Sequence, residues 1–153
     1  MHDGTPSITF TRIWHDDDVV ELAVKVRDDA SSFTTNVYVG HQQLKSVVED
    51  LEGFRNQVHG GLYDLTLGGF GPEYANGALH ARFHFRSPGR LYVSTRQESD
   101  FTEFAVRSVA SEAKLYLVTE PILLDNFISE LACLASESAE QATLECLPNR
   151  GGA

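Results

Sequence analysis

Acidic side chains are the most abundant ionisable groups in this sequence. Aspartate and glutamate together number 22 and lysine and arginine 12, so the formal net charge is −10. The acidic residues cluster in polar segments and on the outer side of a predicted helix, where solvent reaches them. The candidates for function are Asp16, Asp17, Asp18, Asp28, Asp29, Glu49, Asp50, Glu52, Glu98 and Asp100. A general acid needs desolvation to shift its pKa, so we expect these carboxylates to bind a partner and not to catalyse.

The negative charge has two interpretations. An excess of acidic residues keeps a protein soluble, which is the simpler interpretation. It also attracts a basic partner and speeds the encounter with it. The same charge repels the phosphate backbone, so it argues against nucleic-acid binding. We therefore expect the acidic clusters to contact a basic protein.

A second set of chemical groups lies on one predicted strand. Polar positions alternate with apolar ones over residues 79–86, and the polar ones are His80, Arg82, His84 and Arg86. On a strand, His80 and His84 stand about 13 Å apart, too far to hold one metal ion, and the arginine neighbours repel a cation. We expect a solvent-facing polar ladder. A sharper hypothesis is a small basic stripe that pairs with an acidic residue on a neighbouring strand or contacts an acidic partner.

The glycine-rich segment from Gly68 to Gly77 invites comparison with phosphate-binding loops. It lacks the G-x-G-x-x-G spacing and the Gly-Lys-Ser/Thr ending of such loops, and it has the acidic residues Asp64 before it and Glu73 within it. We interpret it as an ordinary long loop. The alternative is a small-ligand-binding protein, or an enzyme of unknown class, that uses this loop and the His80/Arg82 face. That alternative requires a deep pocket in which these residues converge.

Nucleophiles and metal ligands lack the contexts that would activate them. The sequence contains no Gly-x-Ser-x-Gly motif. Cys133 falls on an apolar helix face with no adjacent base, and Cys146 lies in a possible short strand. We expect buried, reduced thiols, with a bridge between the two as the alternative. Asp16 to Asp18 lack the alternating ligand ladder of a calcium loop. We predict no enzyme activity, no cofactor and no metal.

The elements that position these groups show an internal repeat. Apolar residues at offsets 0, 3, 4, 7 and 10 form one face of a predicted helix. They are Leu44, Val47, Val48, Leu51 and Phe54, and the pattern recurs 80 residues later at Leu124, Phe127, Ile128, Leu131 and Leu134. The strands that lead into the two stripes also correspond. The repeat predicts two helices, over about residues 41–56 and 120–135, that cover the core.

Runs of alternating apolar and polar residues predict strands before, between and after these helices. We expect them near residues 7–13, 19–27, 33–39, 62–67, 79–86, 91–97, 101–108 and 112–118. The order lacks the alternation of strand and helix that builds a parallel sheet. The expected class is α+β, a largely antiparallel sheet of about 7–8 strands with two amphipathic helices, in two related halves that each combine a β-hairpin and a helix. Trp14, the only tryptophan, is expected in the core or at the rim of the sheet.

A chain of 153 residues is expected to form a single domain, residues 1–153. We expect an ordered core over about residues 7–136 and a polar, acidic tail over 137–153, with one possible strand around Leu144 and a frayed end. The apolar runs are far shorter than the ~20 residues of a membrane-spanning helix. The N-terminal residues lack the basic start and apolar run of a secretion signal, so we expect a cytoplasmic protein without a membrane partner.

Several segments, taken in order, are similar to one bacterial family. They are the strand end and turn Ile13–Asp18, the hairpin strands Leu22–Val26 and Phe33–Val39, the helix Leu44–Phe54, the strand core Ala81–Phe85, the strand Leu115–Val118 and the helix Glu120–Leu134. Over about residues 7–136, this order resembles the WapI-like immunity proteins of bacterial contact-dependent growth inhibition systems. The likeness rests on pattern and order and not on a signature motif. The extra acidic tail after Ser136 departs from it.

The resemblance implies a cytoplasmic protein that binds and blocks one cognate toxin domain, often a nuclease. Such families carry no catalytic residues, and their toxin-facing residues differ between members, so no residue role is carried over. The negative charge fits this function independently, because a nuclease toxin is usually basic and an acidic inhibitor would be steered to it. A third hypothesis is a structural module that self-associates through its outer strand faces and edges.

Overall fold

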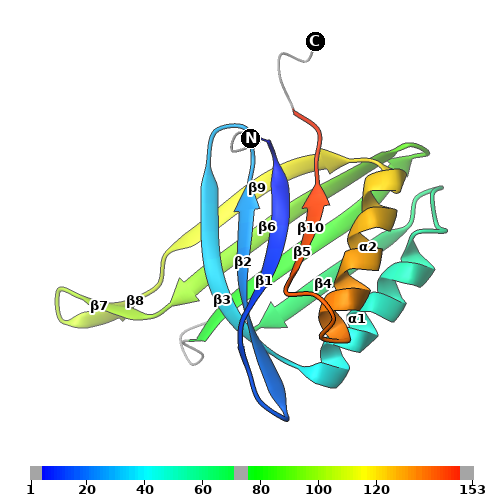
Figure 1. The fold of residues 1–153 in the computed structure, drawn as a ribbon. Coiled ribbons are helices and arrows are strands. Elements are labelled where there is room, and N and C mark those ends of the chain that lie inside the picture. Colours follow the sequence, from blue (N-terminus) through cyan, green and yellow to red (C-terminus); the bar gives the residue numbers. More distant parts are fainter. Residues whose placement is uncertain (1–4, 71–75, 149–153) are drawn as a thin grey trace.

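The computed structural model describes residues 5–70 and 76–148 of the chain. The described residues form strands and helices with the following bounds: β1 Ser7–His15, β2 Val19–Arg27, β3 Ser32–Gly40, α1 His41–Phe54, β4 Leu62–Gly68, β5 Asn76–Ser87, β6 Arg90–Asp100, β7 Thr102–Phe104, β8 Arg107–Val109, β9 Glu112–Thr119, α2 Pro121–Ala135 and β10 Gln141–Glu145. Each helix follows closely on a strand, α1 on β3 and α2 on β9, as the repeat predicts (Figure 1).

The strands form two four-stranded antiparallel sheets and one small hairpin. Sheet A has the order β10-β1-β2-β3, sheet B has the order β4-β5-β6-β9, and β7 pairs with β8. The expected class, α+β with largely antiparallel sheets and two amphipathic helices, is confirmed. The strands outnumber the expectation because residues 101–108 contribute to a hairpin instead of one strand, and because β10 completes sheet A.

The two related halves are visible in the topology. The first half runs β1-β2-β3-α1-β4, and the second runs β5-β6-β9-α2-β10, with the β7-β8 hairpin inserted between β6 and β9. In each half, three strands lead into a helix, and the strand after that helix joins the sheet of the other half. β4 therefore pairs with β5, and β10 pairs with β1. This exchange ties the halves together, because neither sheet is complete without a strand from the other half.

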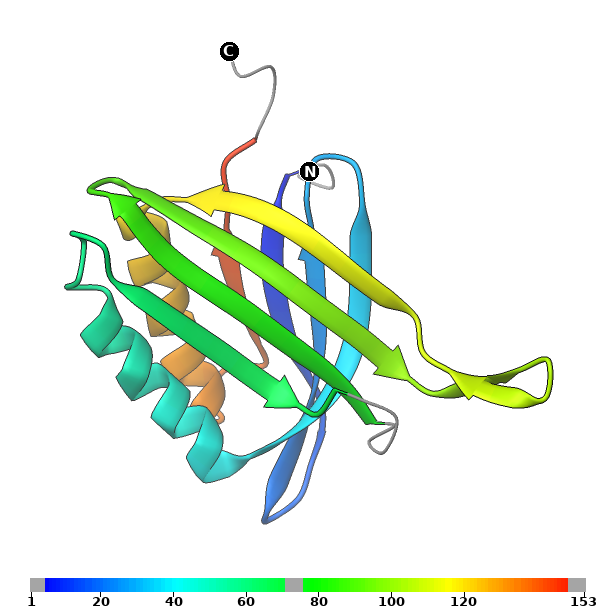
Figure 2. The ribbon, with the colours of Figure 1, turned by 180° about the vertical axis from the view of Figure 1, so that it is seen from behind.

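The two sheets and the two helices enclose a single core. The strands of sheet A cross those of sheet B obliquely, and the helices pack against each other beside β10 and β4 (Figures 1 and 2). All stripe positions of both helices are buried. Phe54 of α1 lies 5.0 Å, ring to ring, from Phe85 of sheet B, and Phe127 of α2 lies 5.7 Å from Phe10 of sheet A. The repeated stripe therefore closes the core over both sheets.

Buried polar side chains join the sheets to each other. The Thr35 hydroxyl on β3 donates a hydrogen bond to the carbonyl oxygen of Glu98 on β6, at 2.9 Å. The side-chain amide of Gln97, also on β6, donates to the carbonyl oxygen of Val24 on β2, at 3.0 Å. A buried donor left without a partner costs about 1–3 kcal/mol. These two bonds therefore help to set the position of β6 against sheet A.

The segment expected as one strand over 101–108 instead belongs to a hairpin, β7-β8, that projects from the body of the molecule (Figure 1). Its turn residues, Ala105 and Val106, have positive φ angles of 51° and 64°. Turns of this kind favour asparagine and glycine. An Ala-Val pair gives no such signal, which is why the single-strand prediction was wrong.

The C-terminal segment contributes to the core, which corrects the expected end of the ordered part near residue 136. β10 is the possible strand expected around Leu144, and it forms an edge of sheet A. The side chains of Ala142 and Leu144 are fully buried. The expected frayed end at 149–153, the first four residues and residues 71–75 of the glycine-rich segment lie outside the described residues.

The two cysteines differ in their surroundings, and both are free, so the alternative of a bridge between them is wrong. Cys146 is buried, as expected. Cys133 is exposed, which corrects the expectation of a buried thiol. It lies beside the stripe positions Leu131 and Leu134 and not among them. Sequence proximity to an apolar stripe therefore does not place a side chain within it.

We expect the two thiols to react at very different rates. Burial raises the pKa of the Cys146 thiol to about 12, so almost none of it is thiolate at neutral pH. Titration of the folded protein with an aromatic disulfide reagent should show one fast thiol, and Cys133→Ser should remove that phase. Both thiols should react quickly in concentrated urea. Equal rates for the two thiols in the folded protein would contradict the prediction.

Candidate partner-binding surface

A bulge in β1 turns Trp14 to the outside of sheet A. Arg12 pairs with Leu22 of β2, and the pairing then shifts by one residue, so that Trp14 pairs with Glu21. Strict alternation along β1 would turn Trp14 towards the core, and the extra residue, Ile13, reverses its side. Trp14 is 48% exposed. The prediction that Trp14 lies in the core is therefore wrong. The apolar pattern of the sequence does not show a bulge, which is why the pattern could not place this side chain.

Trp14, Glu21 and Tyr38 form one row across the outer face of sheet A. Glu21 pairs with Trp14 on one side and with Tyr38 of β3 on the other. The two aromatic rings meet edge to face, with centroids 6.4 Å apart and planes at 79°. Both aromatic side chains are half-exposed, and Glu21 is half-buried between them. The row therefore presents two aromatic rings and a carboxylate to a partner.

The turn after Trp14 carries Asp16, Asp17 and Asp18, all predicted to bind a partner. The Asp16 carboxylate accepts hydrogen bonds from the amides of Val19 and Asp18, at 2.9 and 2.8 Å, and these bonds hold the pKa of Asp16 below its usual value. Asp16 therefore shapes the turn. Asp17 and Asp18 are exposed at its tip, where their charges face solvent.

His41 anchors this turn to both helices. Its Nε2 lies 2.8 Å from the carbonyl oxygen of Asp16, and its Nδ1 lies 3.8 Å from a carboxylate oxygen of Glu137, just after α2. The His41 backbone amide also donates to the carbonyl oxygen of Asp18, at 3.3 Å. The acidic turn is therefore a supported loop that holds its charges in place.

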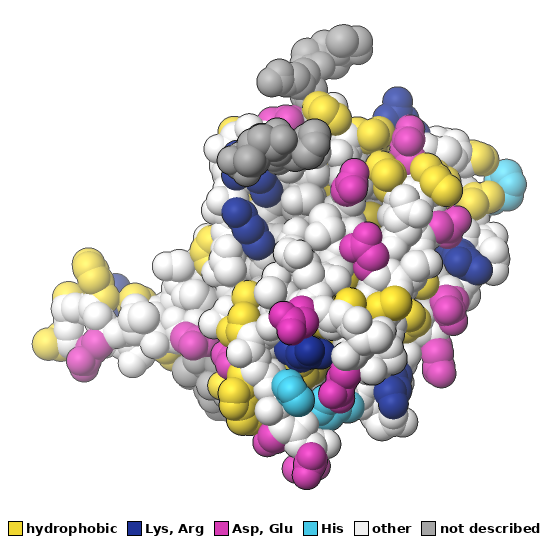
Figure 3. Space-filling model, viewed as in Figure 1, with side chains coloured by type: hydrophobic (Ala, Val, Ile, Leu, Met, Phe, Trp, Pro, Cys, Tyr) yellow, Lys and Arg dark blue, Asp and Glu magenta, His cyan; other side chains and the backbone are white. Residues whose placement is uncertain are grey.

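Acidic and aromatic side chains meet at this end of sheet A. We refer to Trp14, Asp17, Asp18, Glu21 and Tyr38 as the acidic–aromatic patch. Figure 3 shows hydrophobic and acidic side chains together at the lower end of the molecule, where the β1–β2 turn projects. A lysine or arginine side chain of a partner can lie against the aromatic rings and pair with the carboxylates. The patch is thus suited to a basic protein surface.

The other predicted acidic turn lies at the opposite end of β2. Asp28 and Asp29 form the β2–β3 turn, and the Asp28 carboxylate accepts hydrogen bonds from the amides of Ala30 and Ser31, at 2.8 and 2.6 Å. Asp28 therefore shapes its turn as Asp16 does. β2 spans nine residues, so the two turns are roughly 25–30 Å apart. The structure does not bring these predicted residues together in one surface.

Glu49, Asp50 and Glu52 are exposed on α1, as predicted. The hydroxyl of Tyr63 on β4 donates a hydrogen bond to Asp50, at 3.4 Å. Burial, followed by the charge of Asp50, raises the pKa of Tyr63 to about 12. Asp50 therefore takes part in packing α1 on sheet B, whereas Glu49 and Glu52 are surface charges along the helix.

Glu98 and Asp100, predicted in an acidic turn, lie in β6, which ends at Asp100. Glu98 is only 7% exposed, which corrects its assignment to a partner-binding surface. Glutamate, serine and aspartate together are typical of a turn, but β6 pairs here with β5 and β9 on either side. Tertiary pairing therefore overrides the local preference.

The His80/Arg82 face forms ion pairs with a neighbouring strand. His80 Nε2 lies 2.9 Å from Asp64 of β4, and Arg82 donates to both oxygens of the same carboxylate, at 2.8 and 3.1 Å. The hydrogen bonds from Arg82 hold the pKa of Asp64 below its usual value. The hypothesis of a basic stripe that pairs with an acidic neighbour is confirmed. Arg82 borders a depression on the outer face of sheet B that His80 does not line, so these two residues do not converge in that depression.

The projecting β7-β8 hairpin exposes a second apolar feature. At its turn, Phe104 and Val106 are 67% and 98% exposed. The sequence pattern missed this feature because it predicts a single strand over the segment.

Among the described residues, no three histidine, cysteine, aspartate or glutamate side chains are grouped as a metal ion would require. Within that same part of the chain, neither helix is long and apolar enough to cross a membrane.

No family model matches the chain, and no curated protein or solved structure is significantly similar to it. Function is therefore argued from the chemistry of the surfaces described above.

Proposed function

We propose that this protein is a cytoplasmic immunity protein that binds one cognate bacterial toxin domain. It would neutralise the toxin by covering a basic surface, such as the nucleic-acid groove of a nuclease. The observation that carries the proposal is the acidic–aromatic patch, in which Glu21 lies between two half-exposed rings next to a supported acidic turn. The resemblance of the element order to WapI-like immunity proteins supports the same conclusion.

The composition of the patch suits a protein partner. Tryptophan and tyrosine are enriched among the residues that dominate binding energy at interfaces. Carboxylates at the edge of such a contact speed association with a basic partner and oppose an acidic one. The rings of Trp14 and Tyr38 would therefore supply the contact area, and Asp17 and Asp18 would select a basic surface.

The direct test is co-expression with the toxin domain encoded immediately upstream. Cells should survive, and the two proteins should co-purify.

Trp14→Ala should weaken the complex by about 30-fold, because loss of a central aromatic anchor costs about 2 kcal/mol. Changing Asp17 and Asp18 together to lysine should slow association at low salt and weaken its salt dependence, because the turn no longer attracts the partner. Stopped-flow kinetics measures the association rate and its salt dependence.

The matched control changes Glu49 and Glu52 together to lysine, which alters the net charge equally on α1. This control should slow association less than the change at the turn. Equal slowing would show that total charge, and not the patch, steers the encounter. Unaltered binding of Trp14→Ala would place the interface elsewhere. Continued cell death without co-purification would overturn the proposed function itself.

A further inference from the structure

The outer face of sheet B has the opposite charge to the molecule as a whole. Neither helix covers this face, which lies towards the viewer in Figure 2. Side chains that point outward from β5, β6 and β9, or from the turn between β5 and β6, include Arg82, Arg86, Arg90, Arg96 and Lys114. Basic residues are the minority in this chain, 12 against 22 acidic ones. Their concentration on one face is a tertiary feature, because β5, β6 and β9 each contribute.

Part of this positive charge is neutralised within the sheet. Arg82 pairs with Asp64 at 2.8 Å, and Arg96 pairs with Glu112 at 3.4 Å. Arg96 also stacks on the ring of Phe70, 4.2 Å from its centroid. Arg86, Arg90 and Lys114, in contrast, make no ion pair within the described residues, so their charges are available to an anion.

Two tyrosines lie among these cations. Tyr92 of β6 and Tyr116 of β9 are 40% and 67% exposed on the same face. Tyr92 pairs with Val118, and Tyr116 pairs with Ser94, so the two tyrosines are diagonal neighbours. Diagonal positions of an antiparallel pair are roughly 7–8 Å apart, which lets each ring offer its face to a planar group. The Arg86 guanidinium lies 5.8 Å from the centroid of Tyr92, which leaves Tyr116 as the more open ring.

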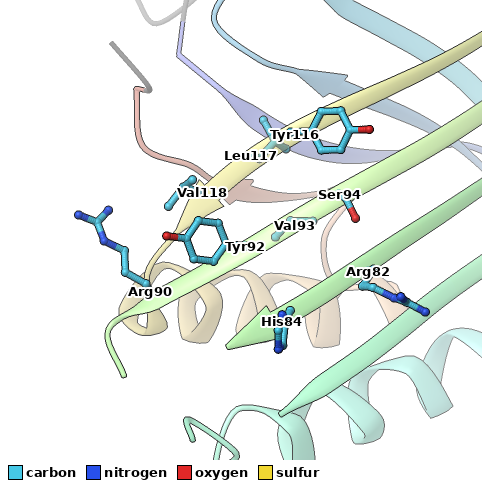
Figure 4. Close-up of a pocket in the computed structure, with 9 residues that line it drawn as sticks. All are labelled: Arg82, His84, Arg90, Tyr92, Val93, Ser94, Tyr116, Leu117 and Val118. Carbon is cyan, nitrogen blue, oxygen red and sulfur yellow. The ribbon is translucent and has the colours of Figure 1, made fainter. Parts of the chain in front are cut away.

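Some of these groups border one depression on the sheet, with a volume of about 560 Å³. The two tyrosines, Arg82 and Arg90 line it, together with His84 and Ser94, whereas Arg86, Arg96 and Lys114 lie outside it. Figure 4 shows the two tyrosines on neighbouring strands, with Arg90 at the end beyond Tyr92. The volume is within the usual range of small-molecule sites, about 300–1,000 Å³. The floor is the sheet itself, so a ligand would lie flat across the strands.

We propose that this depression binds a nucleotide unit, with the base lying across Tyr92 and Tyr116 and the phosphate held by Arg90. The combination of exposed rings and unpaired cations suits a ligand that is both flat and anionic. An acidic peptide would use the cations and leave the ring faces empty, whereas a nucleotide uses both. The Ser94 hydroxyl lies across from Tyr116, on the side away from Arg90, where it can hydrogen-bond the edge of the base. The site is separate from the acidic–aromatic patch, which lies on sheet A.

The net charge of the chain predicts no nucleic-acid binding, and this face is a local exception. A long polyanion would meet the acidic remainder of the surface, so the face suits a free nucleotide or a short single strand. These two sources share one chemistry, base plus phosphate. Titration with AMP and with a short oligoadenylate distinguishes them. Tighter binding of the oligomer would indicate that the ligand is a short single strand. Equal binding would indicate a free nucleotide.

The test follows backbone amide shifts of β6 and β9 by NMR while AMP, adenosine or inorganic phosphate is added at low salt. AMP should bind with saturation and more tightly than either of its parts. Tyr116→Ala should weaken AMP binding by about tenfold, because it removes one stacking surface. Arg90→Gln should weaken binding and reduce its salt dependence, because it removes a phosphate contact.

Matched controls lie on the opposite sheet. Tyr38→Ala removes an exposed tyrosine, and Lys25→Gln removes an exposed cation, both from the outer face of sheet A. Neither should change AMP binding. Far-UV circular dichroism shows whether each variant is folded. Because the substituted side chains are exposed, we expect every variant to fold. The proposal is overturned if AMP does not saturate, if phosphate alone binds as tightly as AMP, or if folded Tyr116→Ala binds AMP like the parent.

Discussion

Phe54→Ala should lower the free energy of unfolding by about 3–5 kcal/mol, as large-to-small changes of buried aromatic residues do. Phe54 is 3% exposed and closes the C-terminal end of the α1 stripe. Its ring centroid lies 6.1, 6.2 and 5.0 Å from those of Tyr63, Phe83 and Phe85. The substitution would leave a cavity where α1 meets sheet B. Urea denaturation followed by circular dichroism measures the loss.

The matched control is the same substitution at an exposed site. Phe104→Ala, in the β7-β8 hairpin, removes a side chain that is 67% exposed and should change stability by no more than about 0.5 kcal/mol. A difference between the two variants would therefore report burial and not the loss of a phenyl ring as such. A loss of less than about 1 kcal/mol for Phe54→Ala would contradict the packing of α1 on sheet B described above.

Gly77→Ala should destabilise the protein by about 2–5 kcal/mol, from two separate causes. Gly77, in β5, has a φ of +86°, a conformation that costs an alanine about 1–2 kcal/mol. A Cβ at this position would also overlap the carbonyl oxygen of Asn36 on β3, and such overpacking costs about 1–3 kcal/mol. The two sheets approach each other here, next to the hydrogen bond from Thr35 to Glu98. Thermal and urea unfolding both measure the effect.

Gly89→Ala separates these two causes. Gly89 has a similar φ of +83° in the β5–β6 turn, but no atom lies within 4 Å of an added Cβ. This variant should therefore lose only the conformational part, about 1–2 kcal/mol. The additional loss at Gly77 is then the cost of forcing the sheets apart. Equal losses at the two positions would show that the close approach of β5 to β3 contributes little to stability.

The two proposed binding surfaces lie on the outer faces of different sheets and have opposite charge. The acidic–aromatic patch on sheet A suits a basic protein, and the basic, tyrosine-bearing face of sheet B suits a flat anion. Each proposal uses exposed side chains that the core does not need. Variants at Trp14 and at Tyr116 therefore test the two surfaces independently, and failure of one proposal leaves the other intact.

Local pattern predicted the helices and most strands because burial in this fold follows simple periods. The helical stripes beginning at Leu44 and Leu124 are buried at every position. Alternation also assigned the outward faces of β2 and β5 correctly. Glu21 of β2 points outward next to Tyr38, and Arg82 belongs to the outward polar ladder of β5. Pro88 and Gly89 form a pair typical of a turn, and Gly89 has the positive φ that such a turn requires.

The misplaced candidates share one physical cause, which is that pairing between distant strands does not appear in local composition. Glu98 looked like a turn residue and is buried in β6 between two partner strands. Trp14, expected in the core or at the rim of the sheet, is turned to the outer face by a one-residue shift against β2. Asp16 and Asp28 are a different, local case, because backbone amides of their own turns donate hydrogen bonds to both carboxylates.

By itself the sequence determined the fold class, the two-fold repeat and the faces of individual elements, because these depend on periodicity within a dozen residues. Only the tertiary structure decided that β4 and β10 are exchanged between the halves. It alone also decided which outward side chains become neighbours, because register between strands far apart in sequence is set by packing. Both proposed sites depend on that register: Trp14 meets Tyr38 across β2, and Tyr116 lies opposite Ser94 and lines the same depression as Arg90 on sheet B.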